Sequence, residues 1–333
     1  MLVQKTSAYR PSWSFYLLAA ILFLVLLVAA QSLSFPPRLF DAGAQSTIVV
    51  HADLVVLPVS VTDSNGKFVS GLKVHDFRLS ENKRLQKVTL FVQEDTPVTV
   101  GLIVDHSRSM RSKLPGVISA VSSFARSSNP EDEMFVVDFN DTVSLELPGG
   151  KPFTNDVSEL EGALSAVSAR GQTTLYDAIV EGLNHLRLGH RDKKALIIVS
   201  DGGDNASHHR YADVLALARK SQAVIYAIGL IDSSTAQEQD PRVLQRLCND
   251  TGGIAFFPKP NESVASISAK IARDLREQYT LGFAPEKTNA ASFRKIQVEV
   301  SAPGRGKLRV RTRAGYLGAA QRQSATPTEK GAS

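Results

Sequence analysis

The sequence contains a single cysteine, Cys248, among 333 residues. An intrachain disulfide needs two cysteines and a thiolate metal cluster needs several, so the sequence excludes both. An isolated cysteine is more often a small core residue than a reactive thiol, and we expect Cys248 to be buried.

The sequence signatures of several enzyme classes are also absent. The chain has no GxSxG nucleophile elbow, no HExxH zinc motif, no GxxxxGK[ST] phosphate loop and no GxGxxG dinucleotide fingerprint. Charge is nearly balanced, because 38 Lys and Arg face 33 Asp and Glu, and the net charge of +5 is too small to indicate nucleic-acid binding. We therefore expect neither an enzyme nor a nucleic-acid-binding protein.

One long apolar run is present near the N-terminus. Residues 15–30 read FYLLAAILFLVLLVAA and follow Lys5 and Arg10. This length is near the lower limit for a membrane-spanning helix and near the upper limit for a signal-peptide core. Small residues before Gln31 suit cleavage, so residues 1–31 are interpreted as a signal peptide or a membrane anchor. Both alternatives predict an extracytoplasmic location: periplasmic, secreted or anchored in the inner membrane.

Two segments have the period-two alternation of half-buried strands. The first, residues 46–95, includes LVVLPVSV, and the second, residues 278–317, includes RKIQVEVSAP and KLRVRTRAGY. Each segment is too short to bury a core alone. We predict that they pack together as one small β-sandwich. Residues 318–333 are small and polar, which predicts a disordered tail.

The central region, residues 96–277, has a different pattern. Short apolar runs such as VTVGLIVD and KALIIVS alternate with stretches that have apolar residues three and four positions apart. Alternating strands and helices predict an α/β fold with a doubly wound, mostly parallel sheet and helices on both faces.

Three polar stretches follow predicted strands or open predicted helices in this region: DHSRSM, RGQTTLYDA and SDGGDN. In an open parallel sheet, ligands bind beyond the carboxyl ends of the strands. The spacing of two between Asp105, Ser107 and Ser109 lets a turning backbone direct the three side chains the same way. Thr173 or Thr174 lies just before a helix, where its hydroxyl could instead cap the helix N-terminus.

Together, in this order, the three stretches resemble the von Willebrand factor type A (VWA) domain and its metal-ion-dependent adhesion site (MIDAS). The resemblance covers roughly residues 96–277. The flanking stretches, among them VSVTDSNGKFVSGLKVHDFRL and LREQYTLGFAP, resemble those of an exported bacterial, acidobacterial-type family of VWA-related proteins.

The resemblance implies a site for Mg²⁺ or Mn²⁺. The hydroxyls of Ser107, Ser109 and Thr173 would bind the ion, and Asp105 and Asp201 would act mostly through bound water. Mg²⁺ takes six oxygen ligands and retains water readily, which agrees with such a set. Neutral hydroxyls leave the ion incompletely neutralised, so it should attract an Asp or Glu of a protein partner.

Position 108 departs from the family pattern, because Arg108 stands where relatives often have Gly. Its cation either recruits an acidic partner or lowers the metal affinity. A degenerate site in a structural envelope protein is therefore one alternative, and a metal-dependent hydrolase is another. His106 should face away from Ser107, which disfavours the hydrolase because no other histidine lies near the first motif.

Several other polar residues have ordinary structural interpretations. Asp177 falls in the first turn of a predicted helix, where an acid is favoured by the helix dipole. Adjacent His208 and His209 are expected in a solvated loop. Five cations alternate along the last predicted strand and are expected on one solvated face, with anionic lipid or polysaccharide binding as the alternative. These cations are Arg305, Lys307, Arg309, Arg311 and Arg313.

Overall fold

A computed structural model of the chain describes residues 54–145, 147–231, 239–259, 261–286 and 292–318. The predictions for residues 1–31 and for the polar tail after residue 318 lie outside these ranges. Within the described ranges, no helix is both long enough and apolar enough to cross a membrane.

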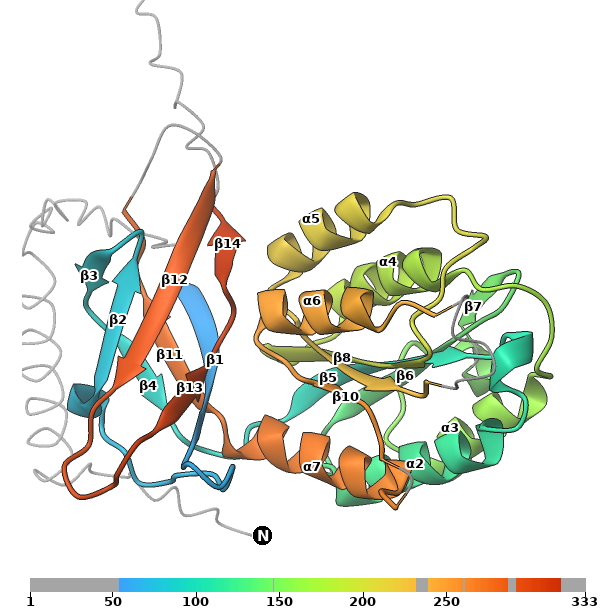
Figure 1. Ribbon diagram of the computed structural model, residues 1–333, viewed down its shortest axis with the longest axis horizontal. Helices are drawn as coiled ribbons and strands as arrows, with labels where there is room; N and C mark the ends of the chain where they lie inside the picture. Colours follow the sequence, from blue (N-terminus) through green and yellow to red (C-terminus); the bar gives the residue numbers. More distant parts are fainter. Residues whose placement is uncertain (1–53, 146, 232–238, 260, 287–291, 319–333) are drawn as a thin grey trace, which may run out of the picture. The chain divides into compact units, whose positions relative to one another are not determined.

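A six-stranded sheet forms the centre of the α/β region, with strand order β10-β9-β8-β5-β6-β7 (Figure 1). Neighbouring strands run parallel except at the β6–β7 edge, which is antiparallel. Their bounds are β5 Val98–Asp105, β6 Glu133–Phe139, β7 Val143–Leu145, β8 Lys193–Ser200, β9 Val224–Gly229 and β10 Ala255–Phe256. Every residue of β5 is buried, as expected for a strand with both faces covered.

Helices cover both faces of this sheet. Helices α2, α3 and α7 lie on one face and α4, α5 and α6 on the other (Figure 1). Their bounds are α2 Leu114–Ser127, α3 Val157–Ala166, α4 Leu175–His185, α5 Tyr211–Ser221, α6 Pro241–Thr251 and α7 Val264–Glu277. The predicted doubly wound α/β fold is confirmed, and Cys248 on α6 is buried in its core.

The flanking strands form two antiparallel sheets that enclose a second apolar core. One sheet has the order β13-β1-β11-β4, with β13 Arg309–Arg311, β1 Val55–Thr62, β11 Tyr279–Phe283 and β4 Leu90–Val92. The other has the order β14-β12-β2-β3, with β14 Gly315–Leu317, β12 Phe293–Val300, β2 Phe77–Glu81 and β3 Arg84–Gln86. Strands from before and after the α/β region pair in both sheets, for example Leu57 opposite Leu281, so the predicted small sandwich is confirmed.

A buried polar cluster joins the sandwich to the α/β region. Asp274 on α7 is 3% exposed, and its carboxylate accepts hydrogen bonds from Ser60 of β1 and Tyr226 of β9, both at 2.7 Å. Arg311 of β13 forms an ion pair with the same carboxylate. Gln278 donates to the Tyr226 hydroxyl at 2.9 Å. The two apolar cores are therefore connected through a hydrogen-bonded charge pair.

The prediction of one solvated basic face on the last strand is wrong. Arg305, Lys307 and Arg309 are exposed, but Arg311 is engaged with Asp274 and Arg313 is only 3% exposed. β13 is three residues long, and the chain after it packs against the α/β region. There Arg313 donates to the carbonyl of Arg219 on α5 at 2.8 Å. Alternation along a strand shows which side chains share a face but not whether that face is covered.

Candidate metal-ion site

The first residue of the candidate site, Asp105, is the last residue of the central strand β5 and has no exposed surface. One carboxylate oxygen accepts the backbone N–H of Ser107 at 2.8 Å, in the loop that follows. The other accepts the hydroxyl of Ser200 at 2.7 Å, at the end of the neighbouring strand β8. Asp105 therefore links the two strand ends from which the first and third polar loops begin.

The two serines of the first loop lie next to each other and reach the third loop. Ser107 precedes a short 3-10 helix, Arg108–Met110, which turns the backbone so that the Ser107 and Ser109 oxygens are 3.1 Å apart. The Ser109 hydroxyl donates to a carboxylate oxygen of Asp201 at 2.9 Å. These contacts and those of Asp105 bring four of the five predicted ligands into one hydrogen-bonded group.

The fifth predicted ligand, Thr173, lies in the loop before α4, and backbone contacts connect this loop to the other two. The Thr173 N–H donates to the side-chain oxygen of Asn205 at 2.9 Å, and the Asn205 N–H donates to the Thr173 carbonyl at 3.1 Å. The Arg108 N–H donates to the Gly171 carbonyl at 3.4 Å. The structure therefore brings all three predicted loops together at one edge of the sheet.

The alternative capping role for a threonine hydroxyl is not observed at Thr174. Thr174 occupies the N-cap position of α4, but its hydroxyl donates to the carbonyl of Asn140 at 2.9 Å rather than accepting a helix N–H. Thr173 is 7% exposed, and within the described part of the chain its hydroxyl donates no hydrogen bond. That hydroxyl oxygen is therefore available to a ligand at the loop surface.

The electrostatics of the group favour a cation. Burial raises the pKa of Asp105 to about 6, hydrogen bonds from Ser107 and Ser200 partly offset this, and the charge of Asp201 raises the pKa further. Asp201 is itself only 2% exposed. Two neighbouring buried carboxylates are costly in a protein interior unless positive charge compensates them.

The donor set also indicates which kind of cation would fit. The candidate residues offer only hydroxyl and carboxylate oxygens, which suit Mg²⁺ or Mn²⁺ better than softer metals. In the described ranges, no three His, Cys, Asp or Glu side chains come together as a metal cluster. The residues present therefore fit a hard, partly hydrated ion and do not form a zinc-type site.

His106 lies between two of these residues but is turned into the protein. It has no exposed surface, and one ring nitrogen lies 2.9 Å from the Asp138 carboxylate of β6. The other ring nitrogen is 3.2 Å from the Leu164 carbonyl. Burial alone would lower the pKa of His106, but its hydrogen bond with Asp138 and the Asp138 charge raise it. His106 is therefore a structural residue beneath the loop and cannot reach a ligand above it.

Asp177 orders the end of the third loop. Its carboxylate accepts the backbone N–H groups of His208 and His209, both at 2.9 Å, and contacts their imidazoles at 3.1 and 2.7 Å. Burial opposes ionisation of Asp177, but these hydrogen bonds outweigh it and lower its pKa. The sequence indicated a structural acid here but not that both histidines would converge on it.

Arg108, the departure from the family pattern, has an exposed side chain next to the two serines. Sequence reasoning missed two further residues of the group, Ser200 and Asn205. Ser200 immediately precedes Asp201 and could have been noticed as a hydroxyl at a strand end. Asn205 lies at the end of the SDGGDN stretch, but its contact with a loop 32 residues earlier could not be inferred from that stretch.

Comparisons with known proteins bear on the family of the α/β region. Residues 100–203 match the family model of the von Willebrand factor type A domain. The α/β region therefore carries a VWA domain, matched over residues 100–203. VWA domains generally act as protein–protein interaction modules. A search of curated proteins found no match.

Several solved structures are similar to the chain at low sequence identity. A von Willebrand factor type A protein from Catenulispora acidiphila is 14% identical, with 72% of this chain and 73% of that chain covered and a TM-score of 0.49. An aerotolerance-related membrane protein from Bacteroides fragilis is 16% identical, with 54% and 98% covered and a TM-score of 0.42. The VWA domain of the type V pili tip protein Mfa5 from Porphyromonas gingivalis is 13% identical, with 55% and 95% covered and a TM-score of 0.44.

Proposed function

We propose that the chain captures a protein partner outside the cytoplasm through a MIDAS in its VWA domain. The observation that carries this proposal is the hydrogen-bonded group that joins Asp105, Ser107, Ser109 and Asp201 across two loops. The Thr173 loop is connected to both of these loops. Oxygen atoms from distant parts of the sequence meet there, as a hard cation requires.

In this proposal the hydroxyls of Ser107, Ser109 and Thr173 hold Mg²⁺ or Mn²⁺ directly, while Asp105 and Asp201 hold its water ligands. The bound ion supplies a positive charge that an outside carboxylate can neutralise. The partner therefore presents an Asp or Glu side chain. Arg108, whose side chain is exposed, adds a cation beside the site and favours the approach of an acidic surface.

The location outside the cytoplasm rests on the apolar segment at residues 15–30. A segment of this kind after Lys5 and Arg10 directs the following chain across a membrane. We favour ligand capture over hydrolysis because His106 is buried against Asp138 and cannot act as a general base at the site.

Adding Mg²⁺ or Mn²⁺ to the full chain should raise its melting temperature relative to chelator. A ligand at about 100 times its dissociation constant stabilises the native state by about 2.7 kcal/mol, which corresponds to about 5 °C for a domain of this size. Thermal melts in a mild detergent, required by residues 15–30, would measure this. The Ser107→Ala/Ser109→Ala variant should melt at the same temperature with metal and with chelator. Equal shifts in both proteins would contradict the proposed ligands.

Capture of an acidic partner should depend on the same residues. Wild-type chain on a resin should retain envelope proteins in Mg²⁺ and release them with chelator, because the partner carboxylate needs the ion. Ser109→Ala should abolish retention without changing the circular dichroism spectrum. Ser301→Ala, which alters an exposed serine of the sandwich, is the matched control and should retain normally. Retention that chelator does not affect would instead support the structural envelope protein, with the sandwich making the contact.

A further inference from the structure

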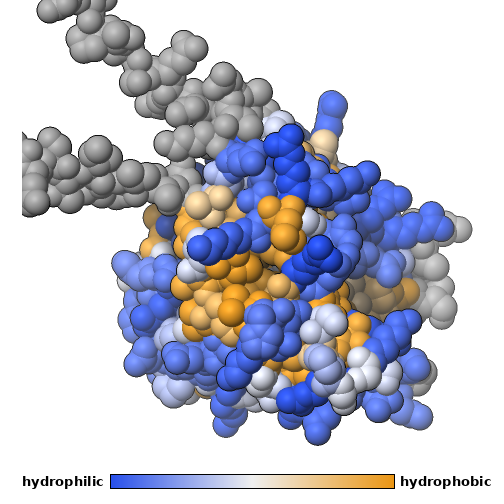
Figure 2. Space-filling model, turned by 90° about the vertical axis from the view of Figure 1, so that its left-hand side faces the viewer, coloured by the Kyte–Doolittle hydropathy of each residue, from blue (hydrophilic) through white to orange (hydrophobic). Residues whose placement is uncertain are grey.

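One side of the sandwich carries an apolar surface with cations around it, and the proposed metal site does not use it. We call it the β2–β3 face. Its exposed residues are Val74, Arg78, Lys83, Leu85, Lys87 and Lys295. Figure 2 looks onto the sandwich from this side and shows apolar surface in the middle with hydrophilic surface around it.

The apolar part of the face lies over an incompletely covered core. Leu85 on the edge strand β3 is 64% exposed and Val74 is 43% exposed. Two hollows of about 440 and 300 Å³ adjoin here and share Arg78 and Leu85 as lining residues. Phe77, which lines the larger hollow, belongs to an aromatic cluster with Phe91 and Tyr279, at centroid distances of 5.1–5.8 Å. Apolar side chains therefore contact water at the open edge between the two sheets.

Cations outnumber acids around this apolar surface. Lys83 and Lys87 flank Leu85 in sequence, and Lys295 is joined to the β2–β3 turn by two hydrogen bonds with Asn82, at 2.8 and 2.9 Å. Three acids lie in the same region. Asp76, next to the lining residue Phe77, accepts the backbone N–H of Lys73 at 2.7 Å. Glu286 pairs with Arg84 at 3.1 Å, and Glu299 lies opposite Arg78 in the sheet. Lys83, Lys87 and Lys295 have no ion pair within the described residues.

The backbone conformation of Lys83 supports a role for the Lys83 charge independently of the surface composition. Asn82 and Lys83 form a two-residue hairpin turn with φ of 47° and 69°. Such a turn favours glycine at its second position, since other side chains are strained in the left-handed region. The turn therefore carries a lysine at a position where the local geometry favours glycine.

We propose that the β2–β3 face docks on an anionic phospholipid surface. Exposed apolar side chains surrounded by lysine and arginine are the combination that binds the interface of an anionic bilayer, where apolar groups enter and cations meet headgroups. The apolar run at residues 15–30 comes shortly before the sandwich in the sequence, so its insertion would tether the following chain to a bilayer. The proposal does not depend on the metal site.

An environment-sensitive dye on the face would test the proposal. Gln86→Cys places a thiol at the rim of the larger hollow, and native Cys248 is fully buried, so an NBD label reacts with the new thiol alone. The labelled full chain is mixed with phosphatidylcholine vesicles with or without about one third phosphatidylglycerol. We expect NBD emission to rise about twofold and shift to the blue with phosphatidylglycerol, and to fall back at high salt.

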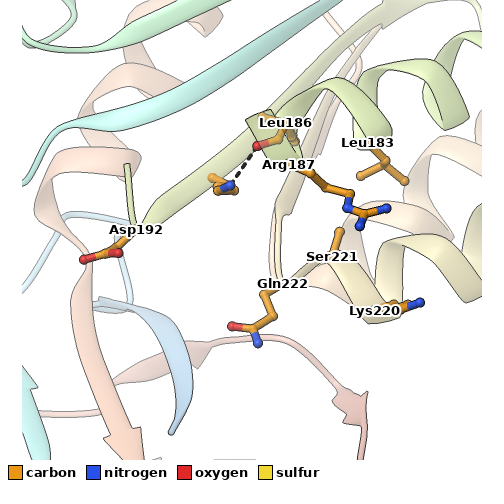
Figure 3. A pocket seen from close by; sticks show the side chains of 8 residues that line it. Leu183, Leu186, Arg187, Asp192, Lys220, Ser221 and Gln222 are labelled. Atoms are coloured by element: carbon orange, nitrogen blue, oxygen red, sulfur yellow. Dashed lines mark hydrogen bonds between the residues drawn. The ribbon is translucent and has the colours of Figure 1, made fainter. Parts of the chain in front are cut away.

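Variants distinguish lipid docking from a folding defect. Lys83→Gly/Lys87→Gln removes two cations, and its glycine relieves the strained turn, so the chain should fold at least as well while the NBD response falls at least threefold. The matched control is Arg187→Gln/Lys220→Gln. It removes two exposed cations that line a hollow of about 220 Å³ in the VWA domain (Figure 3) and should respond like wild type.

A second labelling site tests whether the face itself is responsible. A label at Leu145→Cys, on the edge strand β7 of the VWA sheet, should not respond to phosphatidylglycerol, although Leu145 is 42% exposed. The proposal is overturned if the chain does not float with the vesicles, or if the Gln86 and Leu145 labels respond equally. It is also overturned if the lysine variant matches wild type. None of these results affects the Mg²⁺-dependent rise in melting temperature. The lipid-docking proposal can therefore be wrong while the metal-site proposal holds, and the reverse.

Discussion

Arg311→Ala should lower the free energy of unfolding by about 3–5 kcal/mol. Arg311 is the ion-pair partner of Asp274, whose carboxylate is 3% exposed between the sandwich and the VWA domain. Hydrogen bonds from Ser60 and Tyr226 remain in the variant but leave the carboxylate charge without a cation. A buried charge that loses its partner is among the most destabilising changes a single substitution makes.

Denaturant unfolding of the variant beside two controls would check this expectation. Arg309→Ala removes an exposed cation two residues away on the same strand and should cost less than about 1 kcal/mol. Arg311→Ala/Asp274→Asn should recover part of the loss, because the amide keeps a hydrogen-bonding group but carries no charge. If Arg311→Ala cost no more than Arg309→Ala, the ion pair would not contribute to the junction between the two cores.

The arrangement of the VWA domain could be predicted from the sequence because its central strands contain near-continuous apolar runs. Both β5 and β8 are covered by helices on two faces, so their β-branched runs differ clearly from the alternating pattern of β12. The sandwich was predictable for a different reason. Neither flanking segment can bury a core alone, so association of the two was the remaining way to bury their apolar faces.

The candidate site was predictable only where its residues follow a local pattern. The spacing of Asp105, Ser107 and Ser109 can be seen in the sequence, and the structure brings these three residues together. The contact of Asp105 with Ser200 joins residues 95 positions apart, and no local pattern encodes it. Arg311 is a second case in which a long-range contact could not be predicted. The strand pattern predicted a solvated face, whereas the structure pairs Arg311 with Asp274.

Gly202→Ala should destabilise the chain by about 2–4 kcal/mol and also remove the metal-dependent rise in melting temperature. Gly202 follows the proposed ligand Asp201 and has a φ of 83°, which costs an alanine about 1–2 kcal/mol. A Cβ atom there would lie 2.6 Å from the backbone oxygen of Asp240 at the start of α6, so the loop would have to move. The Gly202 N–H donates to Ser200 at 3.1 Å, and Ser200 holds Asp105.

A matched glycine substitution separates the effect of disturbing the third loop from the general effect of replacing glycine with alanine. Gly162 lies inside α3, and a Cβ atom there would meet no other atom within 4 Å. Gly162→Ala should therefore stabilise the chain by about 0.5–1 kcal/mol through helix propensity and keep the full response to Mg²⁺. Thermal melts of both variants with Mg²⁺ and with chelator give the comparison. A Gly202→Ala protein that still gained stability from Mg²⁺ would show that the ion binds without the third loop, and Asp201 would no longer qualify as a ligand.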